Sequence, residues 1–298
     1  MASSSSSSSS SSFSYFSSSS PNHKVAVVTG SSSGIGYETS LILARNGFIT
    51  YATMRNPNKS KNISSLATKE NLPIHIKQLD VADDMSVKNA VQAISSETGR
   101  IDVLVNNAGY GLNGALEDLA MDEIKAQYET NVFGLIRTTQ AVLPIMRRQK
   151  SGTIINISSG AGRFGIPGVS AYVSTKFAVE GLSESMSYEL EPFGIKVVIV
   201  EPGVIRTNFG NGLVIAKKSQ DPNSAYSQIM QKMATGFEEM MKNSSSPDLV
   251  AEVVLDAATS ENPNLRYLAG NDVETWLGGK RKMADEEFYK MMKQNLMM

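Results

Sequence analysis

Cysteine is absent from this chain of 298 residues. Its absence excludes disulfide bonds, zinc–thiolate sites and thiol nucleophiles. No apolar run reaches about 18 residues, so no membrane-spanning helix is expected. Basic and acidic residues number 28 and 29 and form no basic block, so neither nucleic acid nor an anionic membrane is expected as a partner. The apolar share of 41 % is ordinary for a globular protein.

Lysine and arginine are missing from residues 1–22, which are mostly serine. A polar tract of this kind cannot bury enough apolar surface to offset the entropy of ordering, which predicts a disordered tail. The tract lacks the charged start and apolar middle of a secretory signal. A transit peptide is Ser-rich and acid-poor, as this tract is, but also Arg-rich, so that alternative is the weaker one. We therefore predict a cytoplasmic protein.

From Lys24 onward, short β-branched runs alternate with longer amphipathic stretches. The alternation predicts a single doubly wound α/β domain over 23–298, with a parallel sheet of about seven strands and helices on both faces. Ligands of such sheets bind beyond the carboxyl ends of the strands. The runs predict strands at 24–30, 48–54, 74–79, 102–106, 153–158, 195–201 and 265–269. The amphipathic stretches predict helices near 34–46, 83–97, 121–149, 170–192 and 246–259.

A glycine-rich turn follows the first predicted strand, where Gly30, Gly34 and Gly36 lead into a helix. Glycine permits a tight turn and close approach of the backbone to a pyrophosphate, and the free N–H groups of a helix start favour phosphate. Turns rich in Gly and Ser also occur for structural reasons alone. The position directly after the first strand favours a dinucleotide site.

The end of the second predicted strand bears on the choice between NAD and NADP. An NAD site usually has an acidic residue about 20 residues beyond the glycines, where it accepts a hydrogen bond from the ribose. No acid is in reach here, because the strand ends in Thr53-Met54-Arg55-Asn56. Arg55 could pair with a 2′-phosphate, although a solvated loop charge is the common alternative. We predict NADP as the cofactor, with NAD as a possible substitute.

Tyr172 and Lys176 lie four residues apart in a predicted helix, so their side chains share one face. A neighbouring ammonium favours the phenolate, which is expected to lower the tyrosine pKa from about 10. Such a pair is frequent by chance. Ser159, just past a predicted strand, could polarise a substrate oxygen, although serine there is usually a turn or cap residue. Asn131 within a predicted helix is unfavourable unless it bonds a partner.

Together these motifs resemble, in order and spacing, the short-chain dehydrogenases/reductases over about residues 24–270. Strings at 51–55, 176–185 and 192–194 are most similar to the 17β-hydroxysteroid and retinol dehydrogenase branch. The resemblance implies a Rossmann fold and a homodimer or homotetramer, built on the two long helices. The motifs that carry it are Thr29-Gly30-x3-Gly34-x-Gly36, Asn106-Asn107-Ala108-Gly109, Ser159, Tyr172-x3-Lys176 and Pro202-Gly203.

The resemblance also implies roles. Tyr172 is the general acid/base and Ser159 holds the substrate oxygen. Lys176 binds the nicotinamide ribose and lowers the tyrosine pKa, and Asn131 fixes a water of a proton relay. No metal is implied. The residues implied in cofactor binding are Gly30, Ser32, Ser33, Gly34, Ile35, Gly36, Arg55, Asp80, Val81, Asn107, Ala108, Gly109, Tyr172, Lys176, Pro202, Gly203, Ile205 and Thr207.

The sequence thus predicts an oxidoreductase that prefers NADP(H) and moves a hydride between nicotinamide and a carbonyl or secondary alcohol. Residues 208–245, rich in Met, predict a substrate lid and an apolar steroid-, retinoid- or lipid-like substrate, although 224–241 also fits an ordinary amphipathic helix. Lys217 and Lys218 leave a phosphate-bearing or CoA-linked substrate open. The tail at 272–298 is expected to cover the pocket or a partner subunit. The alternatives are a non-catalytic NADP-binding regulator and an epimerase on the same fold.

Overall fold

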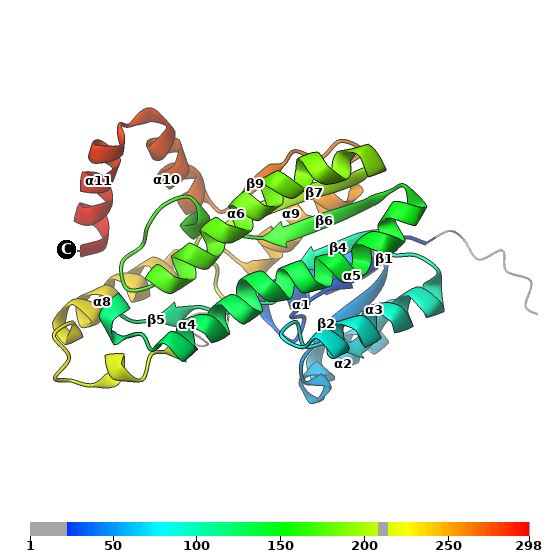
Figure 1. Cartoon of the computed structure of the whole chain (residues 1–298), viewed down its shortest axis with the longest axis horizontal. Coiled ribbons are helices and arrows are strands. Elements are labelled where there is room, and N and C mark those ends of the chain that lie inside the picture. Colours follow the sequence, from blue (N-terminus) through cyan, green and yellow to red (C-terminus); the bar gives the residue numbers. More distant parts are fainter. Residues whose placement is uncertain (1–22, 208–213, 298) are drawn as a thin grey trace, which may run out of the picture.

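The computed structural model describes residues 23–207 and 214–297 (Figure 1). The predicted tail at 1–22 therefore lies outside the described residues, as do positions 208–213 of the predicted lid. The division into a tail and a dehydrogenase domain stays a prediction. Among the described helices, none combines the length and the apolar character needed to cross a bilayer.

Seven parallel strands form the central sheet, in the order β3-β2-β1-β4-β6-β7-β9. The seven predicted strands are confirmed because β-branched runs buried on both faces suit a parallel sheet. The order reverses between β1 and β4, and a ligand site is expected at this switch point. The strands are β1 (Val25–Val28), β2 (Ile49–Met54), β3 (Ile74–Gln78), β4 (Val103–Asn106), β6 (Gly152–Ile157), β7 (Ile195–Pro202) and β9 (Arg266–Ala269).

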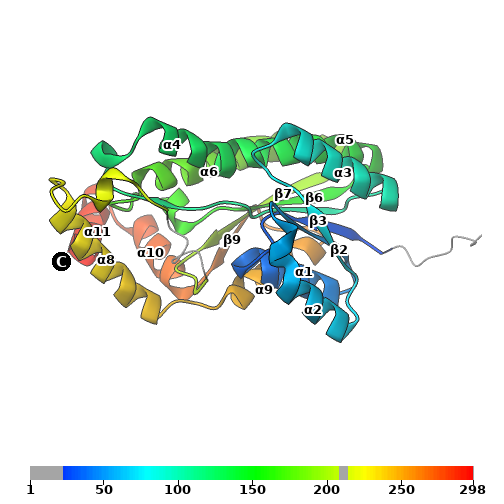
Figure 2. The same cartoon turned by 90° about the horizontal axis from the view of Figure 1, so that it is seen from below.

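Helices cover both faces of this sheet, as Figure 2 shows. One layer contains α1 (Gly34–Arg45), α2 (Lys61–Glu70) and α9 (Pro247–Thr259). The other contains α3 (Asp84–Thr98), α5 (Gly134–Gln149) and α6 (Ser170–Leu190). Successive strand residues point to opposite faces, so Val27 packs in the core beneath α3, α5 and α6, while Val28 packs in the core beneath α9.

The predicted helix at 121–149 is interrupted by one π-helical turn. α4 (Met121–Tyr128) runs into η3 (Glu129–Phe133), which runs into α5. A π-turn inserts an extra residue and rotates the helix, and such turns are frequent at functional sites. Asn131 lies within η3 and is buried. The turn therefore changes the direction in which this asparagine points.

Several elements gather at one end of the molecule (Figures 1 and 2), and of these the sequence predicted only α8, as the amphipathic helix at 224–241. The two-stranded sheet of β5 (Leu112–Asn113) and β8 (Val214–Ile215) lies here with α8 (Ser227–Lys242), α10 (Asn271–Lys282) and α11 (Asp285–Met297). Phe164 and Leu277 belong to one apolar cluster that joins the loop before α6 to α10 and α11. The short turns are η1 (Pro57–Ser60), η2 (Leu116–Asp118), η4 (Gly160–Gly162), η5 (Glu191–Phe193) and η6 (Lys218–Gln220).

Candidate active site

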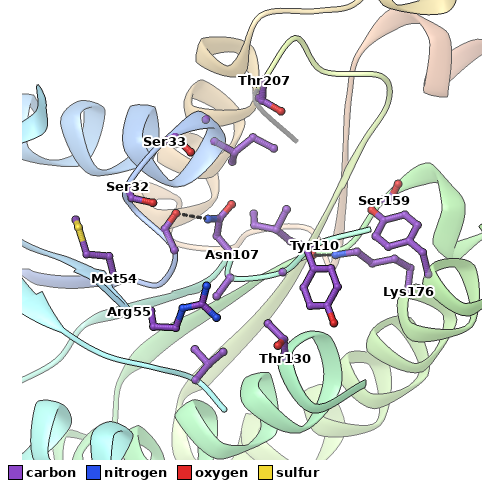
Figure 3. A pocket seen from close by; sticks show the side chains of 18 of the residues that line it. Ser32, Ser33, Met54, Arg55, Asn107, Tyr110, Thr130, Ser159, Lys176 and Thr207 are labelled. Atoms are coloured by element: carbon purple, nitrogen blue, oxygen red, sulfur yellow. Dashed lines mark hydrogen bonds between the residues drawn. The ribbon is translucent and has the colours of Figure 1, made fainter. Parts of the chain in front are cut away.

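A cavity of about 770 Å³ lies at the carboxyl ends of β1 and β4, where the strand order reverses (Figure 3). Its volume is within the range of cofactor sites. All of the residues predicted to bind the cofactor line it, except Gly36. They are Gly30, Ser32, Ser33, Gly34, Ile35, Arg55, Asp80, Val81, Asn107, Ala108, Gly109, Tyr172, Lys176, Pro202, Gly203, Ile205 and Thr207.

The glycines of the first turn are required by the backbone and by close packing. Gly30 and Gly34 adopt φ of +70° and +61°, values that residues with a Cβ rarely adopt. Gly36 is not on the cavity wall. A Cβ at Gly36 would lie 2.6 Å from the Gly30 carbonyl oxygen and overlap the side-chain amide of Asn107. Gly36 thus lets α1 pack closely against the turn.

Thr29 joins this turn to the end of β4, a role that the sequence analysis missed. Its hydroxyl accepts hydrogen bonds of 3.0 Å from the backbone N–H groups of Asn107 and Ala108. The Asn107 amide donates in turn to the Thr29 carbonyl at 2.9 Å. These bonds fix the two walls of the crevice relative to each other. The signal was available, because Thr29 precedes Gly30 directly in the motif.

The end of the cavity near α1 suits an anion. Ser32, Ser33 and Gly34 lie where α1 begins, so the positive end of its dipole faces this region. The exposed Arg55 lies across from them, beside Tyr110 (Figure 3). Burial raises the pKa of the Tyr110 phenol, and the charge of Arg55 opposes that rise. Glycines without a Cβ, hydroxyls and a guanidinium together fit the phosphates of a dinucleotide.

At the other end of the cavity, Ser159 and Lys176 lie close together (Figure 3), and Tyr172 also lines the cavity. Ser159 begins η4, where its hydroxyl accepts from the N–H of Ala161 at 3.1 Å and also hydrogen-bonds the phenol of Tyr172. The Lys176 Nζ atom donates to the carbonyl of Ile157 at 2.8 Å and lies 5.6 Å from the centroid of the tyrosine ring. The predicted constellation is therefore assembled in space.

The pKa values of this group differ in part from expectation. Burial raises the pKa of Tyr172 to about 12, and the hydrogen bond with Ser159 only partly opposes that rise. This direction is opposite to the lowering that we expected from Lys176. Burial also lowers the pKa of Lys176 to about 8, against the attraction of the Glu180 carboxylate. The tyrosine is thus protonated at neutral pH, whereas the lysine titrates near it.

A second cavity of about 680 Å³ meets the first at Ser159 and Tyr172. Its wall is mainly apolar and comes from the loop before α6, from α8, and from α10 and α11. The predicted covering of the pocket by residues 272–298 is confirmed at Trp276, Met292 and Asn295. The apolar residues of the wall include Phe164, Ile166, Pro167, Met233, Phe237, Met240, Met241, Trp276 and Met292.

Comparison with known proteins identifies the family. The family model described as short chain dehydrogenase matches residues 24–218. The chain is a short-chain dehydrogenase. Members of this family are NAD(P)-dependent oxidoreductases that act on CH–OH groups, and this short-chain dehydrogenase shares their seven-stranded parallel sheet.

Three relatives cover most of this short-chain dehydrogenase. An uncharacterised oxidoreductase, YusZ of Bacillus subtilis, is 40 % identical over 86 % of the chain and 92 % of its own length. A 3-ketodihydrosphingosine reductase of Bacteroides thetaiotaomicron is 38 % identical, over 83 % and 88 %. The human 17-beta-hydroxysteroid dehydrogenase type 1 is 34 % identical, over 82 % and 76 %. The predicted similarity to hydroxysteroid dehydrogenases is thereby confirmed.

Two solved structures are also similar. A short-chain dehydrogenase from Streptomyces avermitilis superposes with a TM-score of 0.78 at 34 % identity, over 92 % of this chain and 97 % of that one. A metagenomic short-chain oxidoreductase in complex with NADP gives a TM-score of 0.67 at 26 % identity, over 83 % and 96 %.

In this short-chain dehydrogenase, Asn131 finds the partners that a mid-helix asparagine needs. Its Oδ1 atom accepts from the N–H of Tyr110 at 3.0 Å, and its Nδ2 atom donates to the Tyr110 carbonyl at 2.9 Å and to the Thr175 hydroxyl at 3.2 Å. The amide thus joins η3 to the loop after β4 and to α6. Asn131 does not belong to the cavity wall, and its predicted water contact stays a prediction.

Asp272 is a second residue that the sequence analysis missed. Its Oδ2 atom accepts a 2.7 Å hydrogen bond from the N–H of Val204, just beyond Pro202 and Gly203. An acidic residue after a strand, in the first turn of a helix, was the available signal.

Within the described ranges, no group of three or more His, Asp and Glu side chains is arranged to hold a metal ion.

Proposed function

We propose that this short-chain dehydrogenase prefers NADP(H) and transfers a hydride between the nicotinamide and the carbonyl or secondary alcohol carbon of an apolar, lipid-like substrate. One observation carries the proposal. A dinucleotide-sized cavity with a glycine-rich turn, hydroxyls and Arg55 in its wall meets a mainly apolar cavity at Ser159 and Tyr172. A cofactor in one and a substrate in the other would place their reacting carbons beside the same proton donor.

The residues that would hold the cofactor are those of the first cavity. Ser32, Ser33 and the start of α1 would bind phosphate, and Arg55 would pair with a 2′-phosphate. Lys176 would bind the nicotinamide ribose. The metagenomic neighbour in complex with NADP supports this preference, with NAD as the substitute. A bound nicotinamide supplies the hydride in reduction and accepts it in oxidation.

Ser159 and Tyr172 would act on the substrate oxygen. Both hydroxyls donate hydrogen bonds to that oxygen, which stabilises the negative charge that grows on it as a carbonyl is reduced. Tyr172 then gives up its proton to the oxygen, and the reverse transfer accompanies oxidation. Because burial keeps the pKa of Tyr172 at about 12, the phenol carries the required proton at neutral pH. Asn131 would hold the water that returns a proton through Lys176.

The second cavity supports an apolar substrate over a phosphate-bearing one. Its wall is rich in Met and aromatic side chains, which adapt to hydrophobic molecules. Neither Lys217 nor Lys218 is found among the described residues of that wall, and Lys218 pairs with Asp118 at 3.2 Å. The names of the sphingosine and steroid relatives agree with this class. The described part of the predicted lid, residues 214–245, includes α8 and would cover this cavity.

The assembly state and location belong to the same proposal. Phe133, Phe177 and Tyr188 are 49 %, 46 % and 69 % exposed on η3 and α6. Apolar exposure along these helices supports a homodimer or homotetramer built on α4, α5 and α6. We also propose the cytoplasmic location predicted from the composition of residues 1–22.

The test is a panel of carbonyls and alcohols assayed with NADPH and with NADH, using the wild type and Tyr172→Phe. Loss of the proton donor should lower kcat by at least about 100-fold while the NADPH dissociation constant stays unchanged. Tyr128→Phe is the matched control, since that phenol lies outside the described cavity walls and bonds only Ser174.

Each rival gives a different result in this panel. A non-catalytic regulator would bind NADPH and turn over none of the substrates. An epimerase would interconvert isomers with no net change in nicotinamide absorbance. Wild-type rates in Tyr172→Phe would refute the assignment of the proton donor.

A further inference from the structure

Two buried carboxylates and two partly exposed arginines form a cluster beneath the turn that carries Ser159. Glu180 of α6 is 6 % exposed, and Glu201 of β7 is 0 % exposed. Arg266 of β9 donates from Nε to Glu180 at 3.1 Å, and the same atom lies 3.6 Å from Glu201. Arg163, which follows η4, donates to Glu201 at 2.8 Å. No step of the proposed reaction uses these groups.

Such a cluster is costly for the fold. Two carboxylates taken from water into the interior lose hydration, and ion pairing repays that loss only in part. Apolar side chains of similar volume would hold the same elements together at less cost. A purely structural role therefore explains a carboxylate at position 180 poorly. The surroundings of Glu180 indicate a role in the active site.

Glu180 lies one helical turn after Lys176, so the two side chains share a face of α6 and both are buried there. The same face supports the Ser159 turn. A Cβ at Gly162 would lie 2.9 Å from Cγ of Glu180 and 3.2 Å from the carbonyl of Lys176. The Ser158 hydroxyl also lies beside the Glu180 carboxylate. Glu180 is thus packed between Lys176 and the turn that follows Ser159.

The charge of Glu180 acts on the Lys176 ammonium. Burial alone lowers the pKa of Lys176, and the carboxylate at 180 raises it, so that the outcome is about 8. The other groups facing the ammonium are neutral, namely the ring of Tyr172 and the carbonyl of Ile157. Without Glu180, a larger fraction of the lysine would lose its charge near neutral pH.

The groups that face Glu180 from other elements determine its own state. Burial raises the pKa of Glu180, and the repulsion of Glu201 adds to that rise. The hydrogen bond and the positive charge of Arg266 lower it. Arg266 therefore opposes the loss of charge at Glu180, and its Nη2 atom donates a hydrogen bond of 2.6 Å to the half-exposed Glu184.

We propose that Glu180, anchored by Arg266, is a positioning residue that keeps the Lys176 ammonium charged and the Ser159 turn seated beside Tyr172. This inference rests on the proposed function, because Lys176 and Tyr172 are its reactive pair. Glu180 acts through Lys176 and touches neither substrate nor cofactor.

The test compares Glu180→Gln with Glu184→Gln. Both remove a carboxylate from Arg266, but only the first removes one from the face of Lys176. In Glu180→Gln the alkaline limb of the kcat/KM pH profile should move to lower pH by about half to one unit. Glu184→Gln should leave the limb in place. A purely structural role would change thermal stability in both variants and move neither limb.

A second measurement needs no turnover. Competitive acetylation of lysines over a range of pH, followed by peptide mass spectrometry, reports the pKa of Lys176 directly. That pKa should fall by about half to one unit in Glu180→Gln and stay unchanged in Glu184→Gln. If Glu180→Gln does not fold, Glu180→Asp can replace it, because aspartate retains the negative charge of the cluster. The fall in the Lys176 pKa should then be smaller, because the charge moves away by only one methylene.

The outcomes separate the two proposals. An unchanged Lys176 pKa in a folded variant that still binds NADPH overturns the role of Glu180. If the wild type shows no turnover that depends on Tyr172, the proposed function fails, and the acetylation result still decides whether Glu180 supports the lysine charge.

Discussion

The carboxylate of Asp272 accepts a 2.7 Å hydrogen bond from the backbone N–H of Val204. Asp272 lies in the first turn of α10, whereas Val204 follows the Pro202–Gly203 turn at the end of β7. A Cβ at Gly203 would overlap the carboxylate, so glycine is needed for this approach. Pro202 and Gly203 line both cavities. A C-terminal helix therefore sets the position of their shared wall.

Replacement of Asp272 should weaken cofactor binding. A hydrogen bond to a charged group contributes about 1.5–3 kcal/mol, so Asp272→Ala should raise the NADPH dissociation constant by about 10- to 100-fold. Fluorescence titration measures this constant. Glu274→Ala removes an exposed acid from the same helix and should change little. Equal NADPH affinities in the two variants would show that the turn at Val204 keeps its position without the Asp272 carboxylate.

Arg55→Ala should remove the preference for NADPH. If the guanidinium pairs with the 2′-phosphate, its loss costs about 1.5–3 kcal/mol for NADPH, or about 10- to 100-fold in affinity, and nothing for NADH. Parallel titrations with both nucleotides give the ratio. Lys59→Ala, in η1 outside the described cavity wall, is the matched control. Equal losses for both nucleotides would contradict a phosphate contact.

Two glycine-to-alanine variants should have opposite effects on stability. In Gly36→Ala the new Cβ meets the Asn107 side chain and the Gly30 carbonyl, which should cost about 1–3 kcal/mol and weaken NADPH binding. In Gly181→Ala the Cβ would meet no described atom within 4 Å apart from its chain neighbours and the nearby backbone of its own helix, and the site is an exposed helix interior. Alanine there should add about 0.5–1 kcal/mol. Denaturant unfolding of both variants checks the signs.

Glu38 should make stability depend on pH. Burial and the neighbouring Asp248 raise the pKa of Glu38 from 4.5 to about 7, because a protonated Glu38 can donate to that carboxylate between α1 and α9. The folded state thus binds the proton more tightly than the unfolded state. The resulting stability is fully present below about pH 4.5 and is lost as the pH rises through about 7.

Thermal unfolding at two pH values tests this sign. Glu38→Gln should match the wild type at pH 5 and exceed its Tm by about 2 °C or more at pH 8. Glu252→Gln, an exposed change on α9, should give the same difference from wild type at both pH values. A constant offset for Glu38→Gln would mean that its carboxyl titrates normally.

Much of the fold could be predicted because its signals are local. A buried parallel strand is a short β-branched run, and the turn after β1 needs glycine for positive φ at Gly30 and Gly34. The catalytic group could be predicted for the same reason, since Tyr172 and Lys176 are one helical turn apart. Ser159 and Asn107 follow strands whose order in the sheet is constrained by right-handed crossovers.

The rest depends on contacts between distant parts of the chain. At the π-turn, Asn131 forms hydrogen bonds to Tyr110 and Thr175, and the helical periodicity of the sequence does not reveal these partners. The cluster around Glu180 joins the helix α6 to the strands β7 and β9, which are far apart in sequence. The sign of the Tyr172 pKa shift was wrong because burial, which outweighs the neighbouring charge, is a property of the folded chain.

The second cavity takes much of its wall from the C-terminal helices, which contribute nothing to the described wall of the first. Every residue assigned here to cofactor or proton transfer precedes position 208, whereas α8, α10 and α11 follow the part that the family model matches. Recombination between relatives at that boundary would therefore exchange the C-terminal segment as a unit. The exchange would change which substrates are accepted and leave the reacting groups in place. Among the described residues, the carboxylate of Asp272 and the guanidinium of Arg266 both cross this boundary to the reactive side, so a transplanted segment would need to bring equivalents of each.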